Sequence, residues 1–217
     1  MTRAAIVAAL MLAALPTAAQ SVPGIADDRR MAAAPYYELA ACAVKQSRRS
    51  AEAVLGEAVG SPQEKRRIDA LFNDFGCKEV SNYPDASVNQ KAIAVYNRRA
   101  FIAEALLASR YPDFATTPAP ASVASMPAAS TNARESGQVI MRLSACLAKR
   151  DWAGVTGLLA APYGTDAEGK KIAALRPSIT ACMPDQATSI HPLFLRGALA
   201  ETVLTALKGA PQQSAMR

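Results

Sequence analysis

The stretch RAFIAEALL at residues 99–107 recurs in altered form as RGALAETVL at residues 196–204. Each version places an arginine first and a glutamate sixth among alanine and leucine, which are strong helix formers. We expect each stretch to lie in the last helix of a folded unit, over residues 90–110 and 192–208. The second residue of each stretch is small, which suits close packing of one helix against another.

The similarity extends upstream, where residues 39–71 align with residues 143–175 without a gap. The identical pairs are Leu39/Leu143, Ala41/Ala145, Cys42/Cys146, Lys45/Lys149, Leu55/Leu159, Gly60/Gly164, Glu64/Glu168, Ile68/Ile172, Ala70/Ala174 and Leu71/Leu175. Agreement in both order and spacing is typical of a repeated supersecondary unit. We therefore interpret the chain as two tandem copies of one unit, the alternative being chance similarity between alanine-rich helices.

The predicted fold class is all-α, with four helices in each copy. Apolar residues recur at helical spacing, and no stretch alternates apolar and polar residues for long enough to indicate a strand. Ser47 and Asp151 are suited to be N-caps of a short second helix, and Gly60 and Gly164 are suited to end it. A unit of about 75 residues forms only a marginal core, so a disulfide in each copy would have a structural purpose.

The segments around the two copies differ from them in composition. The predicted order is a signal peptide at 1–19, a flexible stretch at 20–34, repeat unit 1 at 35–111, a linker at 112–136, repeat unit 2 at 137–210 and a frayed tail at 211–217. Pro, Ala, Ser and Thr dominate the linker without hydrophobic periodicity, which predicts an extended and mobile connection. A linker of this length permits the two units to pack on each other or to remain apart.

The first residues have the features of a secretory signal. Arg3 precedes an unbroken apolar run at residues 4–15, and small residues at 17–19 follow the helix-breaking Pro16. The run is shorter than the roughly 20 residues that a membrane-spanning helix needs. We expect cleavage after Ala19 and export, to the periplasm in a Gram-negative bacterium, with a retained anchor as the alternative.

The four cysteines are Cys42, Cys77, Cys146 and Cys182, and an even number in an exported chain predicts disulfides. The two intervals from Cys42 to Cys77 and from Cys146 to Cys182 differ by a single residue, which favours one bridge in each copy. A four-thiolate zinc site is the alternative, but the chain lacks the close cysteine pairs that such sites usually use. No C-x-x-C motif indicates redox catalysis.

The third helix of each copy has a clear start signal. Ser61 and Glu64 form a capping-box pattern with proline at the first helical position, and Thr165 and Glu168 repeat it. The two glutamates are therefore interpreted as helix caps rather than as catalytic carboxylates.

The charged residues Arg99, Glu104, Arg196 and Glu201 recur at matched positions of the last helix, which is otherwise apolar. One interpretation is a polar site in a groove between helices. The other, which we favour, is a structural ion pair, or an arginine that binds carbonyl groups and fixes helix packing, because buried charges are usually paired.

A five-residue spacing separates the arginine and the glutamate of one helix by about 140° around the helix axis, so the two do not face each other. Each glutamate would then need a partner elsewhere. A basic residue of the third helix is the expected partner, either Arg66 or Arg67 in the first copy and Lys170 or Lys171 in the second.

Composition excludes several classes of protein. The chain has 217 residues, a formal charge of +6, 51% hydrophobic and 19% charged residues, and is too apolar to be disordered. Its single histidine, His191, excludes a histidine-rich metal site, and none of the common nucleotide-binding, zinc-protease or serine-hydrolase motifs is present. We expect no cofactor, no metal and no nucleic acid, and at most weak contact with an anionic envelope surface.

The pattern Cys146…Cys182…LRGALAE, ending at residues 195–201, resembles one found in exported helical proteins of Gram-negative bacteria. In the first copy Arg98 and Ala100 replace the leucine and the glycine of this pattern. The resemblance covers about two thirds of the chain and implies export and a helical fold, but it brings no assigned activity.

Three functions remain after these exclusions. The first is a non-enzymatic structural or interaction module of the periplasm, which binds a protein or an envelope partner. The second is a carrier or sensor for a small apolar ligand held between the helices. The third is an enzyme of unknown type, which would need a deep polar pocket around Glu104, Glu201 or His191; we expect the first.

Overall fold

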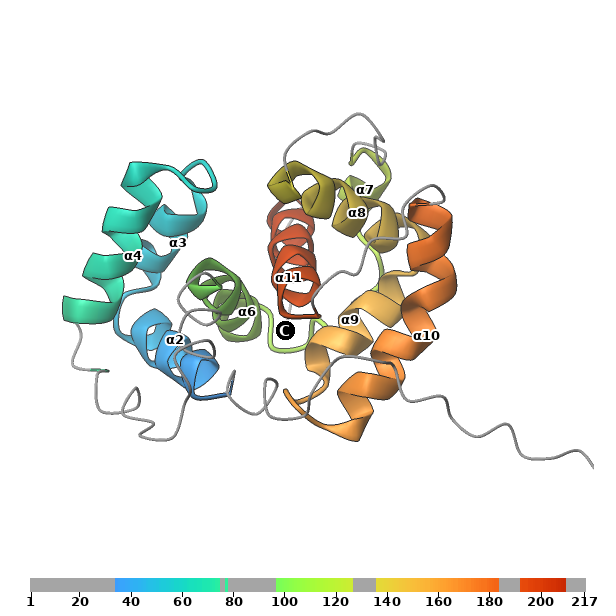
Figure 1. Cartoon of the computed structure of the whole chain (residues 1–217), viewed down its shortest axis with the longest axis horizontal. Coiled ribbons are helices and arrows are strands. Elements are labelled where there is room, and N and C mark those ends of the chain that lie inside the picture. The colour runs from blue at the N-terminus through green and yellow to red at the C-terminus, as the bar shows by residue number, and fades with distance from the viewer. Residues whose placement is uncertain (1–33, 75–76, 78–96, 127–135, 184–191, 210–217) are drawn as a thin grey trace, which may run out of the picture.

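The computed structural model describes residues 34–74, 77, 97–126, 136–183 and 192–209, and the regular structure of these residues is helical throughout (Figure 1). The helices are α2 (Ala34–Gln46), α3 (Arg48–Leu55), α4 (Pro62–Asp74), α6 (Arg98–Arg110), α7 (Ala121–Ala124), α8 (Ser136–Arg150), α9 (Trp152–Ala160), α10 (Asp166–Cys182) and α11 (Pro192–Gly209). The all-α prediction is confirmed for this part of the chain. The predicted signal peptide, the tail at 211–217 and His191 lie outside the described residues.

Helices α6 and α11 pack against each other at the centre of the molecule (Figure 1). On one side of this pair lie α2, α3 and α4, which with α6 we call the N-terminal half. On the other side lie α9 and α10, which with α8 and α11 we call the C-terminal half. Apolar side chains of both halves belong to one buried cluster, so the halves share a core.

The short helices α3 and α9 begin at the residues that the sequence predicts. Ser47 Oγ accepts the backbone N–H of Ser50 at 3.3 Å, and Asp151 Oδ1 accepts that of Gly154 at 2.8 Å. Each cap satisfies a backbone donor that has no partner within its helix. Because a single residue separates α3 from α2 and α9 from α8, the chain turns sharply at both caps.

Gly60 and Gly164 have a different position from the one expected. They do not end α3 and α9, which stop several residues earlier. Both adopt the left-handed conformation, with φ of 78° and 71°, immediately before Ser61 and Thr165. The glycines therefore shape the turn that leads into the third helix of each half, where a side chain would be strained.

Two disulfides join the cysteines that the spacing pairs. Cys42 of α2 is bonded to Cys77, with Cα atoms 6.0 Å apart, and Cys146 of α8 is bonded to Cys182 of α10, with Cα atoms 5.9 Å apart. All four cysteines are used, which excludes the four-thiolate zinc site.

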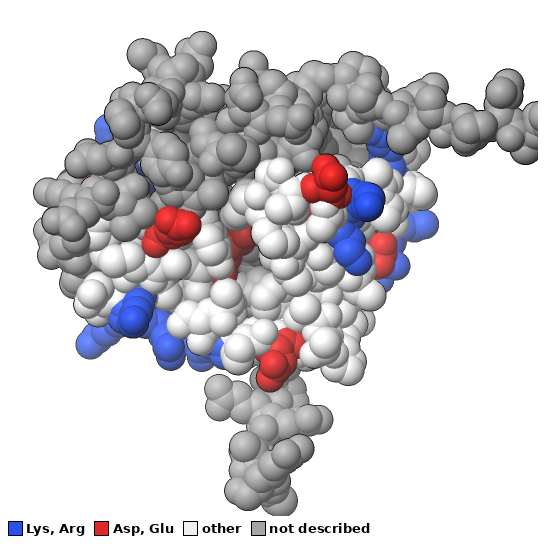
Figure 2. Space-filling view, turned by 90° about the horizontal axis from the view of Figure 1, so that it is seen from below, with Lys and Arg blue, Asp and Glu red and all other residues white. Residues whose placement is uncertain are grey.

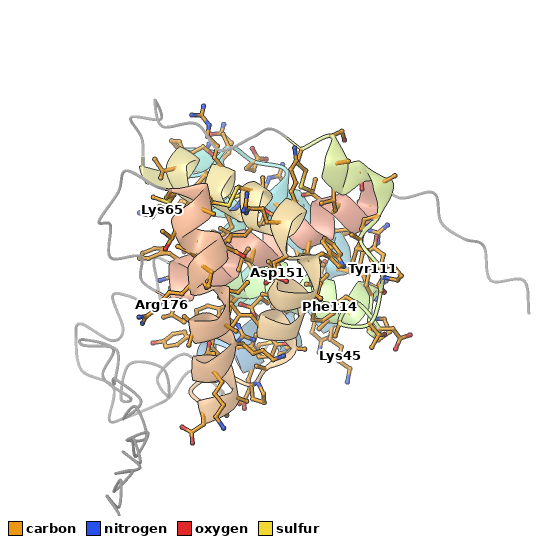
Figure 3. The ribbon with its side chains drawn as sticks, turned by 90° about the vertical axis from the view of Figure 1, so that its right-hand side faces the viewer. Lys45, Lys65, Tyr111, Phe114, Asp151 and Arg176 are labelled. Carbon is orange, nitrogen blue, oxygen red and sulfur yellow. A yellow bond between two sulfur atoms is a disulfide. The ribbon has the colours of Figure 1, made fainter. Side chains whose placement is uncertain are left out.

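The segment predicted as an extended linker is instead packed where the structure describes it. Phe114 and Val123 are buried, and Phe114 lies beside Tyr111 at the edge of the molecule (Figure 3). Trp152 Nε1 donates to the carbonyl of Thr117 at 2.8 Å. The sparse apolar residues of this segment suffice to hold it against the C-terminal half, which periodicity does not reveal.

No helix among the described ranges combines the length and the apolar character that crossing a bilayer requires.

The two halves approach each other closely at Ala100 of α6 and Gly197 of α11. A Cβ atom placed on Gly197 would lie 2.1 Å from the Cβ of Ala100 and 2.9 Å from its Cα. The small residues at matched positions of the two stretches therefore face each other. They allow the helix backbones to come together where a larger residue would separate them.

We expect Gly197→Ala to lower the free energy of unfolding by about 1–3 kcal/mol, because the added methyl group overlaps Ala100 and the helices must separate. Chemical denaturation measures the change. The matched control is Gly157→Ala in α9, where the added Cβ would meet only the flexible end of Lys171, at 3.2 Å. The control should be neutral or slightly stabilising, since alanine favours a helix by about 1 kcal/mol over glycine. Equal effects of the two substitutions would contradict the packing argument.

Candidate functional site

The structure brings together the four charged residues that the sequence singles out on the last helices. Arg99 Nε donates to Glu201 Oε2 at 2.9 Å, and Arg196 Nε donates to Glu104 Oε2 at 2.9 Å. Each arginine therefore binds the glutamate of the other half. The two ion pairs are reciprocal across the contact of α6 with α11, and both depend on the halves being together.

The prediction that Glu104 and Glu201 pair with basic residues of the third helices is wrong. Arg67 pairs instead with Glu57 at 2.6 Å, while Arg66, Lys170 and Lys171 are exposed to solvent. The expectation treated each half alone, whereas the buried charges are neutralised by the opposite half. The spacing of arginine and glutamate along one helix is explained by this exchange, because each side chain meets a different residue of the facing helix.

The capping residues make the bonds that start a helix. The backbone N–H of Glu64 donates to Ser61 Oγ at 3.1 Å, and that of Glu168 donates to Thr165 Oγ1 at 3.3 Å. Each carboxylate accepts in turn the N–H of the left-handed glycine just before the cap, as in Gly164 N to Glu168 Oε2 at 2.9 Å. One oxygen of each carboxylate is thus used within the turn.

The other oxygen of each capping carboxylate binds the arginine of its own half. Arg99 Nη1 donates to Glu64 Oε1 at 3.0 Å, and Arg196 Nη1 donates to Glu168 Oε1 at 3.1 Å. Interpreting these glutamates only as caps missed this second role. Both glutamates are buried in the structure, and the sequence shows only that they recur at matched positions.

Each guanidinium also donates hydrogen bonds to backbone carbonyls at the C-terminal end of a short helix. Arg99 Nη2 donates to the carbonyl of Leu55, and Arg196 Nη2 donates to the carbonyl of Leu159, both at 2.9 Å. Arg99 Nη1 also donates to the carbonyl of Val54 in α3 and to that of Glu57 just beyond it. The carbonyls of Leu55 and Leu159 lie at the C-terminal ends of α3 and α9, where the helix dipole favours a positive charge.

Tyr163 distinguishes the two arginine sites. Its hydroxyl donates to Glu104, and its ring covers the guanidinium of Arg196, with Cζ 4.0 Å from the ring centroid. Tyr37 and Phe101 pack on the same ring, at centroid distances of 5.7 Å and 5.9 Å. Sequence reasoning did not identify Tyr163, although the alignment places this aromatic residue opposite Val59 in the first half.

Burial and charge shift the ionisation of this site. Desolvation raises the pKa of Glu104 above its usual value, and Arg196 opposes that rise. Desolvation and the neighbouring Glu104 raise the pKa of Tyr163 well above its usual value. Burial alone would lower the pKa of Arg196, but Glu104 and Tyr163 outweigh it and the pKa of this guanidinium rises.

The two arginines neutralise only half of the carboxylates that surround them. Glu64, Glu104, Glu168 and Glu201 supply four negative charges to two guanidinium groups. Because two carboxylates share each guanidinium, they need further hydrogen-bond donors, which the glycine N–H groups and the Tyr163 hydroxyl supply. The view from below shows acidic atoms recessed between the two halves (Figure 2).

Within the described residues no cluster of three histidine, cysteine, aspartate or glutamate side chains is arranged to hold a metal ion. The Nε and both Nη atoms of Arg99 and Arg196 are occupied by partners in the protein. The arrangement therefore serves to hold helices together, and its polar groups act on one another.

Comparisons of the chain with family models, with curated proteins and with solved structures find no match.

We expect the stability of the protein to contain a component that falls as the pH rises above about 4.5, the usual pKa of a glutamate. Because burial raises the pKa of Glu104 in the folded state, that state binds a proton more tightly than the unfolded chain. The stabilisation is complete below the unfolded pKa and is lost as the pH rises through the folded one. Denaturation in urea at a series of pH values measures this component.

Two variants separate Glu104 from other titrating groups. Glu104→Gln should lack the component, so the stability difference from the wild type shrinks as the pH rises. Tyr163→Phe keeps the carboxylate but removes a hydrogen bond that lowers its pKa, so the loss should extend to higher pH. Parallel pH profiles for the wild type and Glu104→Gln would exclude Glu104 as the source.

Proposed function

We propose that this protein is an exported structural or interaction module of the cell envelope, built from two tandem copies of a disulfide-pinned four-helix unit. The observation that carries the proposal is the reciprocal exchange of Arg99–Glu201 and Arg196–Glu104. The charged residues that would otherwise form a polar active site are used to lock the two copies into one body. A body of this kind presents fixed helical surfaces to a partner.

Matched contacts support the duplication. The two arginines contact glutamates, capping carboxylates and carbonyls that correspond in the aligned sequence, and the bonds use the same guanidinium nitrogens. Chance similarity between helices accounts for shared composition but not for a shared set of bonds. We infer that the central contact of α6 with α11 is the interface of the two copies.

The two disulfides support export, because such bonds persist in oxidising compartments. The leader-like residues 1–19 agree with this inference. We propose the periplasm as the compartment, after cleavage near Ala19.

The partner is expected to be anionic and to dock on the C-terminal half. Lys149, Arg150, Lys170, Lys171 and Arg176 are exposed, and none of them forms an ion pair within the described part of the chain. Figure 3 shows Arg176 at the edge of α10. An unneutralised positive surface attracts a partner of opposite charge and speeds its association.

The N-terminal half is less positive, because residues 34–74 and 97–111 hold nine Lys and Arg against seven Asp and Glu, whereas residues 136–183 and 192–209 hold eight against four. Three of its surface cations are also paired. Arg67 binds Glu57, Arg98 binds Asp69 and Arg110 binds Glu52. The difference between the halves allows a charge-matched experiment.

The test uses the full mature chain to capture a partner from an envelope extract. Binding of the same chain to phosphatidylglycerol vesicles is measured separately. The variant Lys149→Glu/Lys170→Glu/Arg176→Glu should lose at least about tenfold in binding, because a positive surface becomes negative. The control Lys45→Glu/Arg49→Glu/Lys65→Glu changes the same charge on the N-terminal half and should retain binding.

Capture of the same partner by the wild type and by the control, with loss in the first variant, would support the proposal. Binding to neutral vesicles as strongly as to phosphatidylglycerol, equal losses in both variants, or recovery of no partner and no oligomer would count against it. Far-UV circular dichroism of each variant shows that a loss reflects the surface and not unfolding.

A further inference from the structure

The guanidinium groups of Arg99 and Arg196 are held in equivalent orientations. In each, Nε binds the glutamate of the opposite half, Nη1 binds the capping glutamate and Nη2 binds the carbonyl of the aligned leucine, Leu55 or Leu159. Arg99 Nη2 also binds Glu201. Three bonds to matched groups fix the plane of a guanidinium. Each arginine therefore presents the same face to the turn that follows its short helix.

The two turns are also equivalent. In both turns the left-handed glycine, Gly60 or Gly164, comes five residues after the leucine whose carbonyl binds the arginine, and its N–H donates to the capping glutamate. The residue before the glycine is Val59 in one turn and Tyr163 in the other. The backbone thus carries Val59 at the place from which Tyr163 covers its arginine.

Because Val59 occupies the position that corresponds to Tyr163, the Arg99 site is more open to solvent than the Arg196 site. Val59 is 62% exposed and carries no ring. The side chains of Arg99 and Glu201 keep 11% and 18% of their surface exposed, against 4% for each of Arg196 and Glu104. The Arg99–Glu201 pair is therefore more exposed to solvent than the pair that Tyr163 covers.

The surrounding residues differ in the same direction. Tyr37 and Phe101, which pack on the Tyr163 ring, align with Met141 and Ala198 in the second half. Both replacements lack an aromatic ring, and Met141 is only partly buried. The Arg99 site thus has the charged residues of its counterpart, while the three described positions that correspond to Tyr163, Tyr37 and Phe101 carry no aromatic ring.

We propose that the Arg99–Glu201 pair binds a phenol group, whose ring stacks on the guanidinium of Arg99 and whose hydroxyl donates to Glu201. The Tyr163 site shows that this geometry is favourable in this protein, with a ring over Arg196 and a hydroxyl on Glu104. Stacking of a cation on an aromatic face and a hydrogen bond to a carboxylate both favour a phenol over other rings. The phenol comes from a small molecule or from a tyrosine side chain, and the experiment distinguishes these sources. This inference does not depend on the anionic partner proposed above.

The test follows the Arg99 Nε–Hε resonance of the full mature chain by NMR while p-cresol is added. A ring stacked on the guanidinium shifts this resonance upfield, as the Tyr163 ring should already do for Arg196. We expect a saturable shift in roughly the millimolar range, as small ligands with few contacts show. Toluene, which lacks the hydroxyl, should bind at least about tenfold more weakly, since it leaves Glu201 without its bond.

N-acetyltyrosinamide identifies the source of the phenol. Saturable shifts with both probes assign the site to a tyrosine side chain, and shifts with p-cresol alone assign it to a small phenol. No shift with either probe, or equal binding of toluene and p-cresol, would overturn the proposal.

Substitutions at the exposed position 59 give a second readout. Val59→Tyr should place a phenol on Arg99 from within the chain, shift the Arg99 resonance without ligand and abolish the response to p-cresol. Val59→Leu, the control without a ring, should respond like the wild type. A Val59→Tyr chain that still binds p-cresol with unchanged affinity would show that the ligand lies elsewhere.

Discussion

The fold depends on the exchange of arginine–glutamate pairs between α6 and α11. Arg99 and Arg196 each join three elements, because each binds a helix end, a capping carboxylate of its own half and a glutamate of the other half. A guanidinium suits this role, since its planar set of donors binds several acceptors at once. Removing one partner would leave carboxylates buried without compensation, which costs more than the intact pair contributes. The exchange therefore specifies one register of the two halves, because any other register buries unpaired charges.

This register requires that the two backbones come close together. Gly197 and Ala100 approach each other closely, and each directly follows the arginine of its own helix. A larger residue at either position would separate the helices and lengthen both pairs at once. The close contact of Gly197 with Ala100 and the two arginine–glutamate pairs therefore depend on the same short distance between α6 and α11. Apolar side chains of both halves fill the rest of the interior.

Much of the helical architecture is predictable from local signals, because caps, glycines and apolar spacing act over a few residues. The all-helical character and the caps at Ser47 and Asp151 follow from such signals, and the cysteine pairings follow from two nearly equal intervals along the chain. The recurrence of Arg99 and Glu104 as Arg196 and Glu201 is visible in the sequence, but the partners of these residues are not. A partner contributed by the other half lies about a hundred positions away, and no local pattern encodes it. The packed segment at residues 112–126 was missed for the same reason, since single apolar residues such as Phe114 and Val123 hold it.

The differences between the halves show which buried positions tolerate a change of residue and which do not. A buried hydrogen bond joins Ser144 to Thr202 at 2.7 Å, whereas the aligned residues of the first half, Ala40 and Ala105, are buried without a polar side chain. Either solution satisfies the interior, because a hydroxyl pair and two methyl groups each leave no polar group unpaired. The arginines and the glutamates admit no such exchange, since replacing one member leaves a charge buried alone. This difference in cost accounts for the identity of the two halves at these charged positions and for the variation around them, including Val59 opposite Tyr163.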